Sequence, residues 1–333
     1  MIKFAGRRLL SSLPALILVL LLVFSLVRMI PGDPAVALLG AGATDEQIEF
    51  LREQLNLNQP FLQQLGSYLV DILHGDLGES MRTKQPVMQE LLDRLPATLE
   101  LSIFAAIIAI IIGVPLGILS AKKPNSFIDH FTRVFSLIGV SAPAFWLALI
   151  LQLIFSLSLG WFPVSGRLDA AIRSSEAGSF VIFGNLFNGH LDYAWSGLQH
   201  IILPAFVLAA FYGAVIARFL RTSMIEVIHS DYIRTAKGKG VKKGIILRSH
   251  ELRNALLPVV TIMGLKFAEM LSGSILTETV FSWPGIGRYM RDAISNRDYP
   301  VVQGAVLMFA VIYMISSFLV DLVYGLLDPR IRM

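Results

Sequence analysis

The pair His250-Glu251 is the clearest beginning of a metal site in this chain of 333 residues. In the H-E-x-x-H motif, two histidines one helical turn apart bind zinc, and the glutamate between them acts as a general base. Asn254 occupies the place of the second histidine, so the motif is incomplete. We interpret both residues as structural and predict no metal site and no catalytic residue.

The stretch GKGVKKG, from Gly238 to Gly244, contains the residue types of a phosphate-binding loop. Such a loop needs the order G-x-x-x-x-G-K-[ST], because its backbone amides and its lysine together hold the phosphates. The order here is different, so we predict that this chain binds no ATP and no other cofactor. The chain also lacks cysteine, which excludes disulfides and thiolate chemistry.

The composition indicates a membrane protein. Hydrophobic residues make up 55% of the chain, charged residues 16%, and the mean hydropathy is +0.66, which is too apolar for a soluble domain of this length. A helix needs about 20 apolar residues to cross a bilayer. We therefore predict an all-α, polytopic membrane protein with six transmembrane helices: Leu9–Val27, Leu101–Ala121, Val134–Gly166, Tyr193–Ala217, Val259–Val280 and Tyr299–Val320.

Basic residues are concentrated in short segments on one side of these spans, and the positive-inside rule places both termini on that side, in the cytoplasm. Trp161, Trp195 and Trp283 fall at predicted outer span ends, where tryptophan commonly lies at the lipid–water interface. The first span follows two arginines but is too long for the apolar region of a signal peptide. We predict that it is an uncleaved anchor.

A few polar residues and one proline fall within or near these spans. Lys266 and Glu269 stand three residues apart and form either a proton path or, as we favour, an ion pair or a subunit contact. Glu278 lies near an outer span end, where it acts as a gate or reaches the lipid headgroups. Ser141 and Pro143 either loosen a helix beside a pathway or serve close helix packing.

The segments outside the membrane are long on one side. Between Pro31 and Leu99, Thr44 with Gln47 predicts a capped helix, and the apolar spacing from Phe61 to Ile72 predicts a second, amphipathic one. These helices form a small outer lobe. The other outer segment, Trp161 to Gln199, is rich in glycine and serine and is predicted to be an irregular loop with one short helix.

A basic segment from Asp231 to Pro258 separates two apolar runs and contains seven Lys or Arg residues, so it cannot lie in lipid. Asp231 is predicted to cap a helix that Gly238 and Gly240 end. Helices below about 12 residues are marginal in water, so this one needs a partner surface. The alternative is an ordinary basic loop that follows the positive-inside rule and binds nothing.

The next predicted helix, from Ile245 to Leu257, is amphipathic. Ile245, Leu252 and Leu256 share its apolar side, and Pro258 opens the following span at a position where a missing N–H costs little.

The order Arg234-Thr235-Ala236, Gly240, His250, Leu252 to Ala255 and Leu257-Pro258 resembles the cytoplasmic coupling loop of ABC-importer permeases, in the branch that carries dipeptides and oligopeptides. The broader family begins this loop with Glu-Ala-Ala, and Arg234 and Thr235 depart from that pattern as the peptide branch does. Further stretches resemble the same branch: MIPGDP at 29–34, GDLGES at 75–80, PVSGR at 163–167, ILTETVFSWPGIGR at 275–288, RDYPVVQG at 297–304 and DPR at 328–330.

The resemblance implies a membrane-spanning subunit of an ATP-driven importer in the bacterial inner membrane. Its expected partners are a second, homologous permease subunit, two cytoplasmic ATPases and an extracytoplasmic peptide-binding protein. ATPase activity would belong to the partners, and the spans would alternate between inward-open and outward-open states. Coupling to the ATPases is expected through the loop helix at 231–240, with Asp231, Tyr232, Arg234, Thr235, Ala236, Lys237 and Gly240.

The resemblance also implies a division of the chain. We expect an anchor helix and outer lobe at 1–94, a permease domain at 95–328 that contains the coupling loop at 222–258, and a cytoplasmic tail at 329–333. Related permeases carry glutathione, nickel complexes or haem, so these substrates remain alternatives. An ion-coupled secondary transporter should show repeat symmetry between halves, and an intramembrane hydrolase should show a nucleophile opposite His200; the sequence shows neither.

Overall fold

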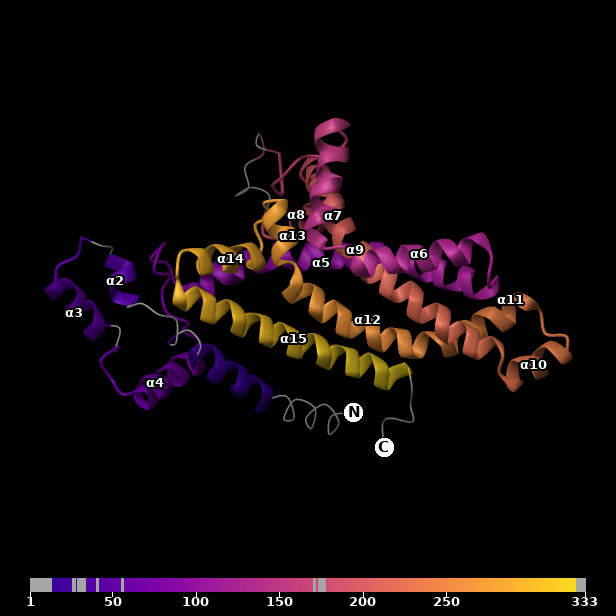
Figure 1. Ribbon diagram of the computed structural model, residues 1–333, viewed down its shortest axis with the longest axis horizontal. Helices are drawn as coiled ribbons and strands as arrows, with labels where there is room; N and C mark the ends of the chain where they lie inside the picture. Colours follow the sequence, from indigo (N-terminus) through magenta and orange to yellow (C-terminus); the bar gives the residue numbers. More distant parts are fainter. Residues whose placement is uncertain are drawn as a thin grey trace.

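The computed structural model describes residues 14–25, 28, 34–39, 42–54, 57–169, 172 and 178–327. Among them the regular structure is helical, apart from one isolated bridge between Glu79 and Pro86, so the predicted all-α class is confirmed. The start of the predicted first span, most of the MIPGDP sequence, and the DPR sequence with the tail lie outside the described residues. The molecule is elongated, with α3 near one end and α10 at the other (Figure 1).

Apolar helices form the body of the molecule. A shorter apolar helix, Pro14–Ser25, lies within the predicted first span. Within the described part of the chain, four helices are long and apolar enough to cross a membrane: α5 (Val87–Lys122), α9 (Leu191–Ile228), the helix Lys243–Leu271, and α15 (Tyr299–Leu327) over Tyr299–Val320.

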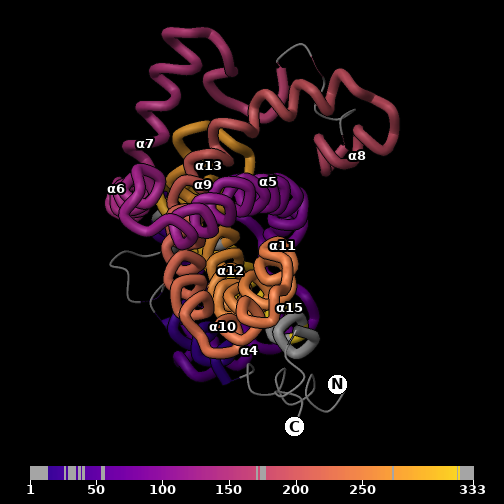
Figure 2. The backbone as a smooth tube through the Cα atoms, turned by 90° about the vertical axis from the view of Figure 1, so that its right-hand side faces the viewer, coloured from indigo at the N-terminus to yellow at the C-terminus, as the bar shows by residue number. Residues whose placement is uncertain are grey.

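The predicted span Val134–Gly166 is wrong as a single helix. The chain forms α6 (Phe127–Ser141), then α7 (Ala144–Leu151), which continues into the π-helical segment η1 (Gln152–Ser158). The two parts meet at an angle of 107°. Figures 1 and 2 both show α7 leaving the side of the bundle.

Pro143 explains the break. A proline ring clashes with the residue before it in helical conformation, and the proline has no N–H to donate. Ala142 accordingly adopts extended angles, φ −73° and ψ 129°, and α6 ends at Ser141. Ser141 and Pro143 were both expected to loosen a helix or to serve close packing, but a bend of this size was not predicted.

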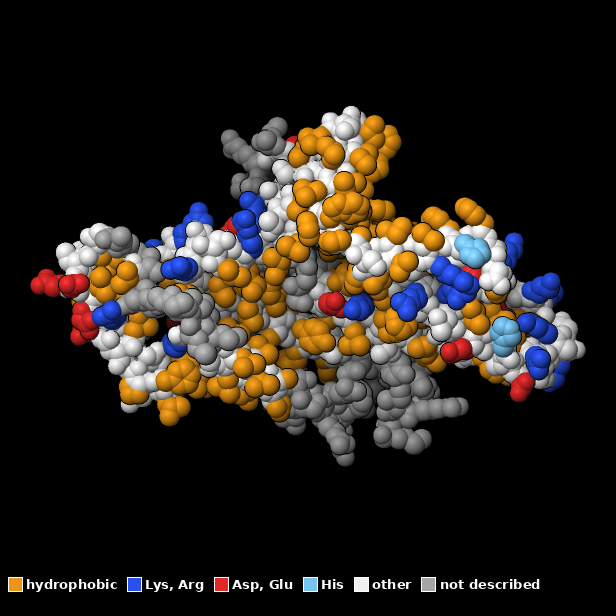
Figure 3. All heavy atoms as spheres, in the orientation of Figure 1, with side chains coloured by type: hydrophobic (Ala, Val, Ile, Leu, Met, Phe, Trp, Pro, Cys, Tyr) orange, Lys and Arg blue, Asp and Glu red, His pale blue; other side chains and the backbone are white. Residues whose placement is uncertain are grey.

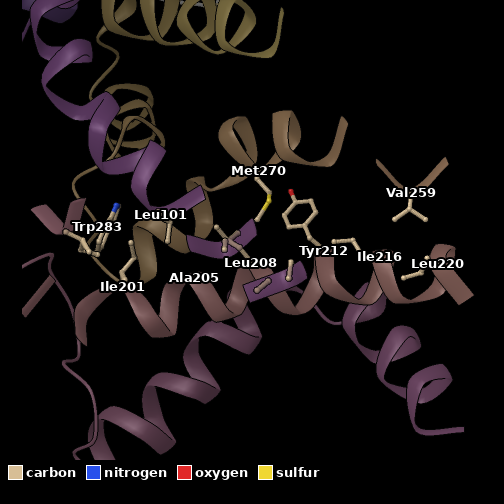
Figure 4. Close-up of a cluster of buried hydrophobic side chains, with 14 of the residues drawn as sticks. Leu101, Ile201, Ala205, Leu208, Tyr212, Ile216, Leu220, Val259, Met270 and Trp283 are labelled. Carbon is tan, nitrogen blue, oxygen red and sulfur yellow. The ribbon is translucent and has the colours of Figure 1, made fainter. Parts of the chain in front are cut away.

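The core lies between α5, α9 and α12 (Arg253–Gly273). Figure 4 shows Leu101, Leu208 and Tyr212 in this cluster of buried side chains. Small residues let the helices approach closely, since a Cβ on Gly113 of α5 would lie 2.7 Å from the Gly213 carbonyl oxygen of α9.

The helix after the basic segment differs from its prediction in register and bounds. It runs without interruption through α11 (Lys243–Ile245), the π-helical η2 (Ile246–Leu252) and α12. Ile245 is 49% exposed, whereas Ile246 is 2% exposed, because a π-helix has a wider turn and shifts the buried face. Pro258 lies inside α12 rather than opening a span.

The predicted span Val259–Val280 is also corrected at its C-terminal end. α12 ends at Gly273, and a separate short helix, α13 (Ile275–Val280), follows. Then comes α14 (Ile286–Ser295), which precedes α15.

The segment predicted to form the outer lobe is helical over most of its described residues before His74. It contains α2 (Pro34–Leu39), α3 (Asp45–Gln54) and α4 (Phe61–Leu73). The predicted cap of α3 is present: the Thr44 amide donates to Gln47 Oε1 at 3.0 Å, and the Gln47 amide donates to Thr44 Oγ1 at 3.4 Å.

The other outer segment contains the expected short helix, α8 (Val181–Asn188). However, α9 already begins at Leu191, before the predicted end of the loop at Gln199.

Candidate functional site

The basic segment begins with the short helix α10 (Asp231–Gly238). The N-cap position belongs to Ser230, so the predicted capping role of Asp231 is wrong. Asp231 instead occupies the first helical position, where its negative charge is favourable beside the helix dipole. No side-chain capping bond is present, since Ser230 Oγ donates to the Val227 carbonyl at 2.6 Å.

One apolar residue attaches α10 to the rest of the chain. Ile233 is fully buried, whereas most of the predicted coupling residues are exposed and Ala236 is half-buried. Arg234 and Asp231 form a weak ion pair at 3.9 Å with both side chains almost entirely in solvent. The helix therefore presents polar and charged groups outward from a single buried anchor.

Two further features hold α10 in place. The Asn254 side-chain amide donates to the Tyr232 hydroxyl at 3.1 Å, which connects α10 to the start of α12. After the helix, Gly240 adopts a φ of +74°, which a residue with a side chain rarely takes, and its amide donates to the Lys237 carbonyl at 3.0 Å. Gly240 thus ends the helix, as predicted.

At the other end of the bundle, the motif stretches that lie far apart in the sequence meet in one region. We call this region the outer cluster and define it by its four buried carboxylates: Glu90, Glu100, Glu278 and Asp298. Burying a charge is costly unless hydrogen bonds compensate, so the partners of each carboxylate indicate what the region is built to hold.

Glu278 is fully buried and does not reach the protein surface, so it does not extend to lipid headgroups. Its Oε1 accepts hydrogen bonds from Thr98 at 2.9 Å and from Ser274 at 2.8 Å. Its Oε2 accepts the Arg288 amide at 2.9 Å. The carboxylate therefore joins α13 to α5 and to the start of α14.

The position of this carboxylate and of the helix beside it explains why the PGIG sequence has glycine at 285 and 287. A Cβ on Gly285 would lie 2.4 Å from the Glu278 oxygens, and one on Gly287 would lie 2.8 Å from Ile275 Cα. A side chain at either position would collide with the network, so close approach rather than a special φ requires glycine here.

Asp298, in the RDYPVVQG stretch, binds the turn that contains GDLGES. The Ser80 hydroxyl donates to Asp298 Oδ2 at 2.6 Å, and the Met81 amide donates to Oδ1 at 3.1 Å. These bonds connect the end of the outer lobe to the start of α15.

Arg167, in the PVSGR stretch, forms a buried ion pair with Glu100 at 2.6 Å. The other Glu100 oxygen accepts the Ile182 amide at 2.8 Å, at the N-terminus of α8. The Arg167 guanidinium also lies 5.8 Å from the centre of the Trp283 ring. The second outer segment is thereby fixed to α5 and to the PGIG loop.

Trp283 itself corrects a prediction. It is fully buried, and its indole N–H donates to the Ala97 carbonyl at 2.9 Å, so it is a core residue and not part of an interfacial belt. Trp161 and Trp195 are each 62% exposed.

Glu90, in the first turn of α5, connects this helix to the turn before it and to α14. It accepts hydrogen bonds from Thr83, at 2.9 Å, and from the Tyr289 hydroxyl of α14, and it pairs with Arg94 at 3.3 Å. Burial, followed by the bond to the Glu90 carboxylate, raises the pKa of Tyr289 above its ordinary value. Tyr289 therefore stays protonated and keeps donating to Glu90.

The predicted pathway residues do not form one group. Lys266 and Glu269 form an ion pair on α12 and line an open pocket of about 460 Å³ with Tyr313 of α15. Ser141 and Pro143 lie at the break between α6 and α7, and Glu278 belongs to the outer cluster.

Several residues of these sites were not predicted from the sequence. Ile233 had a detectable signal, since it is the aliphatic residue of a charged helix. Glu90 had a partial signal, because Arg94 stands four residues after it. Thr98 and Glu100 had none, because their partners lie far along the chain; Thr98 and Glu278 are 180 residues apart.

Comparison with known families gives two matches. Residues 113–333 match the model described as binding-protein-dependent transport system inner membrane component, and residues 1–102 match the model for the N-terminal part of such components. Among solved structures, the inward-facing MetNI methionine ABC transporter shares the fold, with a TM-score of 0.52 at 16% identity over 72% of this chain and 97% of that one.

Full-length relatives are similar along the whole chain. A dipeptide transport system permease protein of Alkalihalophilus pseudofirmus is 46% identical over 332 residues, which cover 100% of both chains. The corresponding protein of Escherichia coli is 43% identical over 336 residues, covering 100% of this chain and 99% of the relative. The chain therefore belongs to the family of binding-protein-dependent transport system inner membrane components, multi-pass proteins of the bacterial inner membrane.

Proposed function

We propose that this chain is a permease subunit of an ATP-driven importer that carries dipeptides or short oligopeptides into the cell. The names of its full-length relatives support the substrate class. The proposed arrangement has six spans and cytoplasmic termini, with the bent pair α6–α7 as one span and the helix Pro14–Ser25 as part of another. The α10 end of the molecule then faces the cytoplasm.

Coupling to ATP hydrolysis is assigned to α10. The observation that carries this assignment is the exposed polar surface of a helix that is attached by one buried residue, Ile233. A helix of eight residues is not stable in water by itself, so a second surface is expected to cover it. ATPase movement at α10 would pass into α9, which precedes it, and into the continuous helix of α11, η2 and α12, which follows it, and would drive alternating access.

The remaining partners are a second permease subunit, two ATPases and an extracytoplasmic binding protein. We propose an outer part at 1–94, a permease domain at 95–328 with the coupling loop at 222–258, and a tail at 329–333. Because α5 begins at Val87, one continuous helix crosses the first of these boundaries.

We also propose a residue for the gate of the transport pathway. Glu278 is suited to it, because it joins three elements at the outer end and has no ion pair within the described residues. We propose that Lys266 and Glu269 serve as an internal ion pair or as a contact with another subunit. We propose that the break between α6 and α7, at Ser141 and Pro143, lies at the edge of the pathway. Glutathione, nickel complexes and haem are the alternative cargoes, and an ion-coupled transporter is disfavoured by the binding-protein-dependent family.

The test combines two variants of α10. The first variant replaces Arg234 and Lys237 with Glu, which reverses the exposed positive charges. The second, Gly240→Pro, removes both the φ of +74° and the amide that donates to the Lys237 carbonyl. We expect each variant to insert normally but to lose ATPase copurification and to reduce uptake of a labelled dipeptide by about tenfold or more, because lost interface contacts of about 1.4 kcal/mol change affinity tenfold.

The matched control replaces Lys122 and Lys123 with Glu, because these exposed basic residues lie at the C-terminal end of α5, outside α10. It should leave uptake near the unmodified level. Normal uptake by the Arg234/Lys237 variant would contradict the coupling assignment, and uptake by the chain alone under an ion gradient would contradict the importer itself.

A further inference from the structure

A pocket of about 580 Å³ opens between α6 and α9, near the end of the bundle that carries α10. We call it the arginine pocket and define it by six of its lining residues, which are Arg133, Ser136, Leu137, Val140, Arg218 and Arg221. Its lining runs along α6 from the second turn to the last residue, Ser141, and along α9 from Arg218 to Thr222, so it includes no residue of α10 or of the outer cluster.

The pocket has an excess of positive charge. Asp129 is buried beside it and accepts hydrogen bonds from Arg221 Nε at 2.6 Å and from Arg133 Nη2 at 2.6 Å. This one carboxylate offsets one of three guanidinium charges. Arg218 is exposed and makes no ion pair or side-chain hydrogen bond within the described part of the chain, and Nη1 of Arg221 likewise has no partner there.

A second observation points to a ligand in the same place. Ser136 is 7% exposed, and its buried hydroxyl has no hydrogen-bond partner among the described residues. A buried hydroxyl without a partner is destabilising, and most such groups in native proteins are satisfied. An oxygen of a bound anion in the pocket would accept from Ser136 and from the free guanidinium donors together.

The surroundings of the pocket are apolar. Leu137 and Val140 line it and are 68% and 41% exposed, and Phe131 and Val134 continue this exposed face along α6. Figure 3 shows hydrophobic side chains beside the Lys and Arg side chains that gather at this end. These surroundings suit a ligand that carries both an anionic group and an apolar chain.

We propose that the arginine pocket binds the phosphate headgroup of an anionic phospholipid, with its acyl chains along Leu137 and Val140. Basic pockets between transmembrane helices are a known form of headgroup recognition, and arginine supplies several N–H donors in a planar array that suits phosphate. The bound lipid would connect α6 to α9 close to the point where α9 leads into α10.

The test uses the purified full chain, delipidated in neutral detergent, with phosphatidylglycerol as the probe and phosphatidylcholine as the uncharged comparison. Lipid retention is measured by native mass spectrometry, and thermal unfolding is measured in parallel. We expect phosphatidylglycerol to be retained and to raise the Tm, and phosphatidylcholine to do neither. Arg218→Gln and Ser136→Ala should each weaken phosphatidylglycerol binding by about tenfold, the effect of one charge-assisted hydrogen bond.

Both variants should fold, because neither side chain has a partner to lose within the described residues. Arg248→Gln is the matched control: it removes the same charge from an exposed position at the same end, outside the pocket. Equal retention of the two lipids, or equal behaviour of Arg218→Gln and Arg248→Gln, would overturn the proposal. The proposal would also be overturned if inorganic phosphate or Ala-Ala raised the Tm and phosphatidylglycerol did not, because the pocket would then bind a soluble anion.

Discussion

Glu278 shows how one buried carboxylate determines the residues around it. Its oxygens take hydrogen bonds from two hydroxyls and a backbone amide, and this close arrangement leaves no volume for a side chain at Gly285. In the sequence, Glu278 stood out by its place near a predicted span end, with a gate and headgroup contact as the two interpretations. The sequence could not reveal Thr98, since nothing local to α5 indicates a partner 180 residues away.

Gly285→Ala should destabilise the protein by about 1–3 kcal/mol, the usual cost of adding a methylene to a filled site. Its φ of −94° suits alanine, so the cost comes from the Cβ contact with the Glu278 oxygens alone. Thermal unfolding of the purified protein measures the change. Gly244→Ala is the control, because a Cβ there meets nothing within 4 Å, and an equal Tm for the two variants would contradict the packing argument.

At the scale of the element, local signals were predictable and helix irregularities were not. The Thr44–Gln47 cap and the helix end at Gly240 depend on neighbouring residues, and both are present as predicted. The register of η2 depends on a π-helical turn. An amphipathic pattern read with a period of 3.6 therefore assigned Ile245 to the buried side and overlooked Ile246.

Ile246→Ala should cost about 2–5 kcal/mol, as expected for a fully buried aliphatic side chain. Ile245→Ala, on the adjacent exposed position, should change stability by at most about 0.5 kcal/mol. Chemical or thermal unfolding of the two purified variants gives the comparison directly. The reverse order of stabilities would contradict the burial of Ile246 and the exposure of Ile245.

The whole molecule separates two kinds of site along its length. The exposed helix α10 lies at one end, and the four buried carboxylates of the outer cluster lie toward the other, with apolar helices between them (Figure 1). The apolar segments and the charge distribution predicted this separation. The meeting of four motif stretches in the outer cluster was not predictable, because it results from contacts between elements that are distant in the sequence.

The chain has no cysteine, so single introduced cysteines can test the proposed orientation. Gln63→Cys in α4 and Lys239→Cys after α10 both replace exposed residues. In spheroplasts, a membrane-impermeant maleimide should label residue 63 at once and residue 239 only after the membrane is opened. Labelling of residue 239 in intact spheroplasts would show that the orientation is reversed.

The hydrogen bond between Ser80 and Asp298 has a consequence for biogenesis. The two residues are 218 positions apart, so the ribosome makes the outer lobe and its turn long before it makes the acceptor. Until α15 enters the membrane, the amide of Met81 and the hydroxyl of Ser80 lack this partner. The turn at Ser80 is therefore synthesised early but gains these hydrogen bonds only when residue 298 has been made. In a chain truncated before residue 298, we expect this turn to be cleaved by proteases faster than in the full chain.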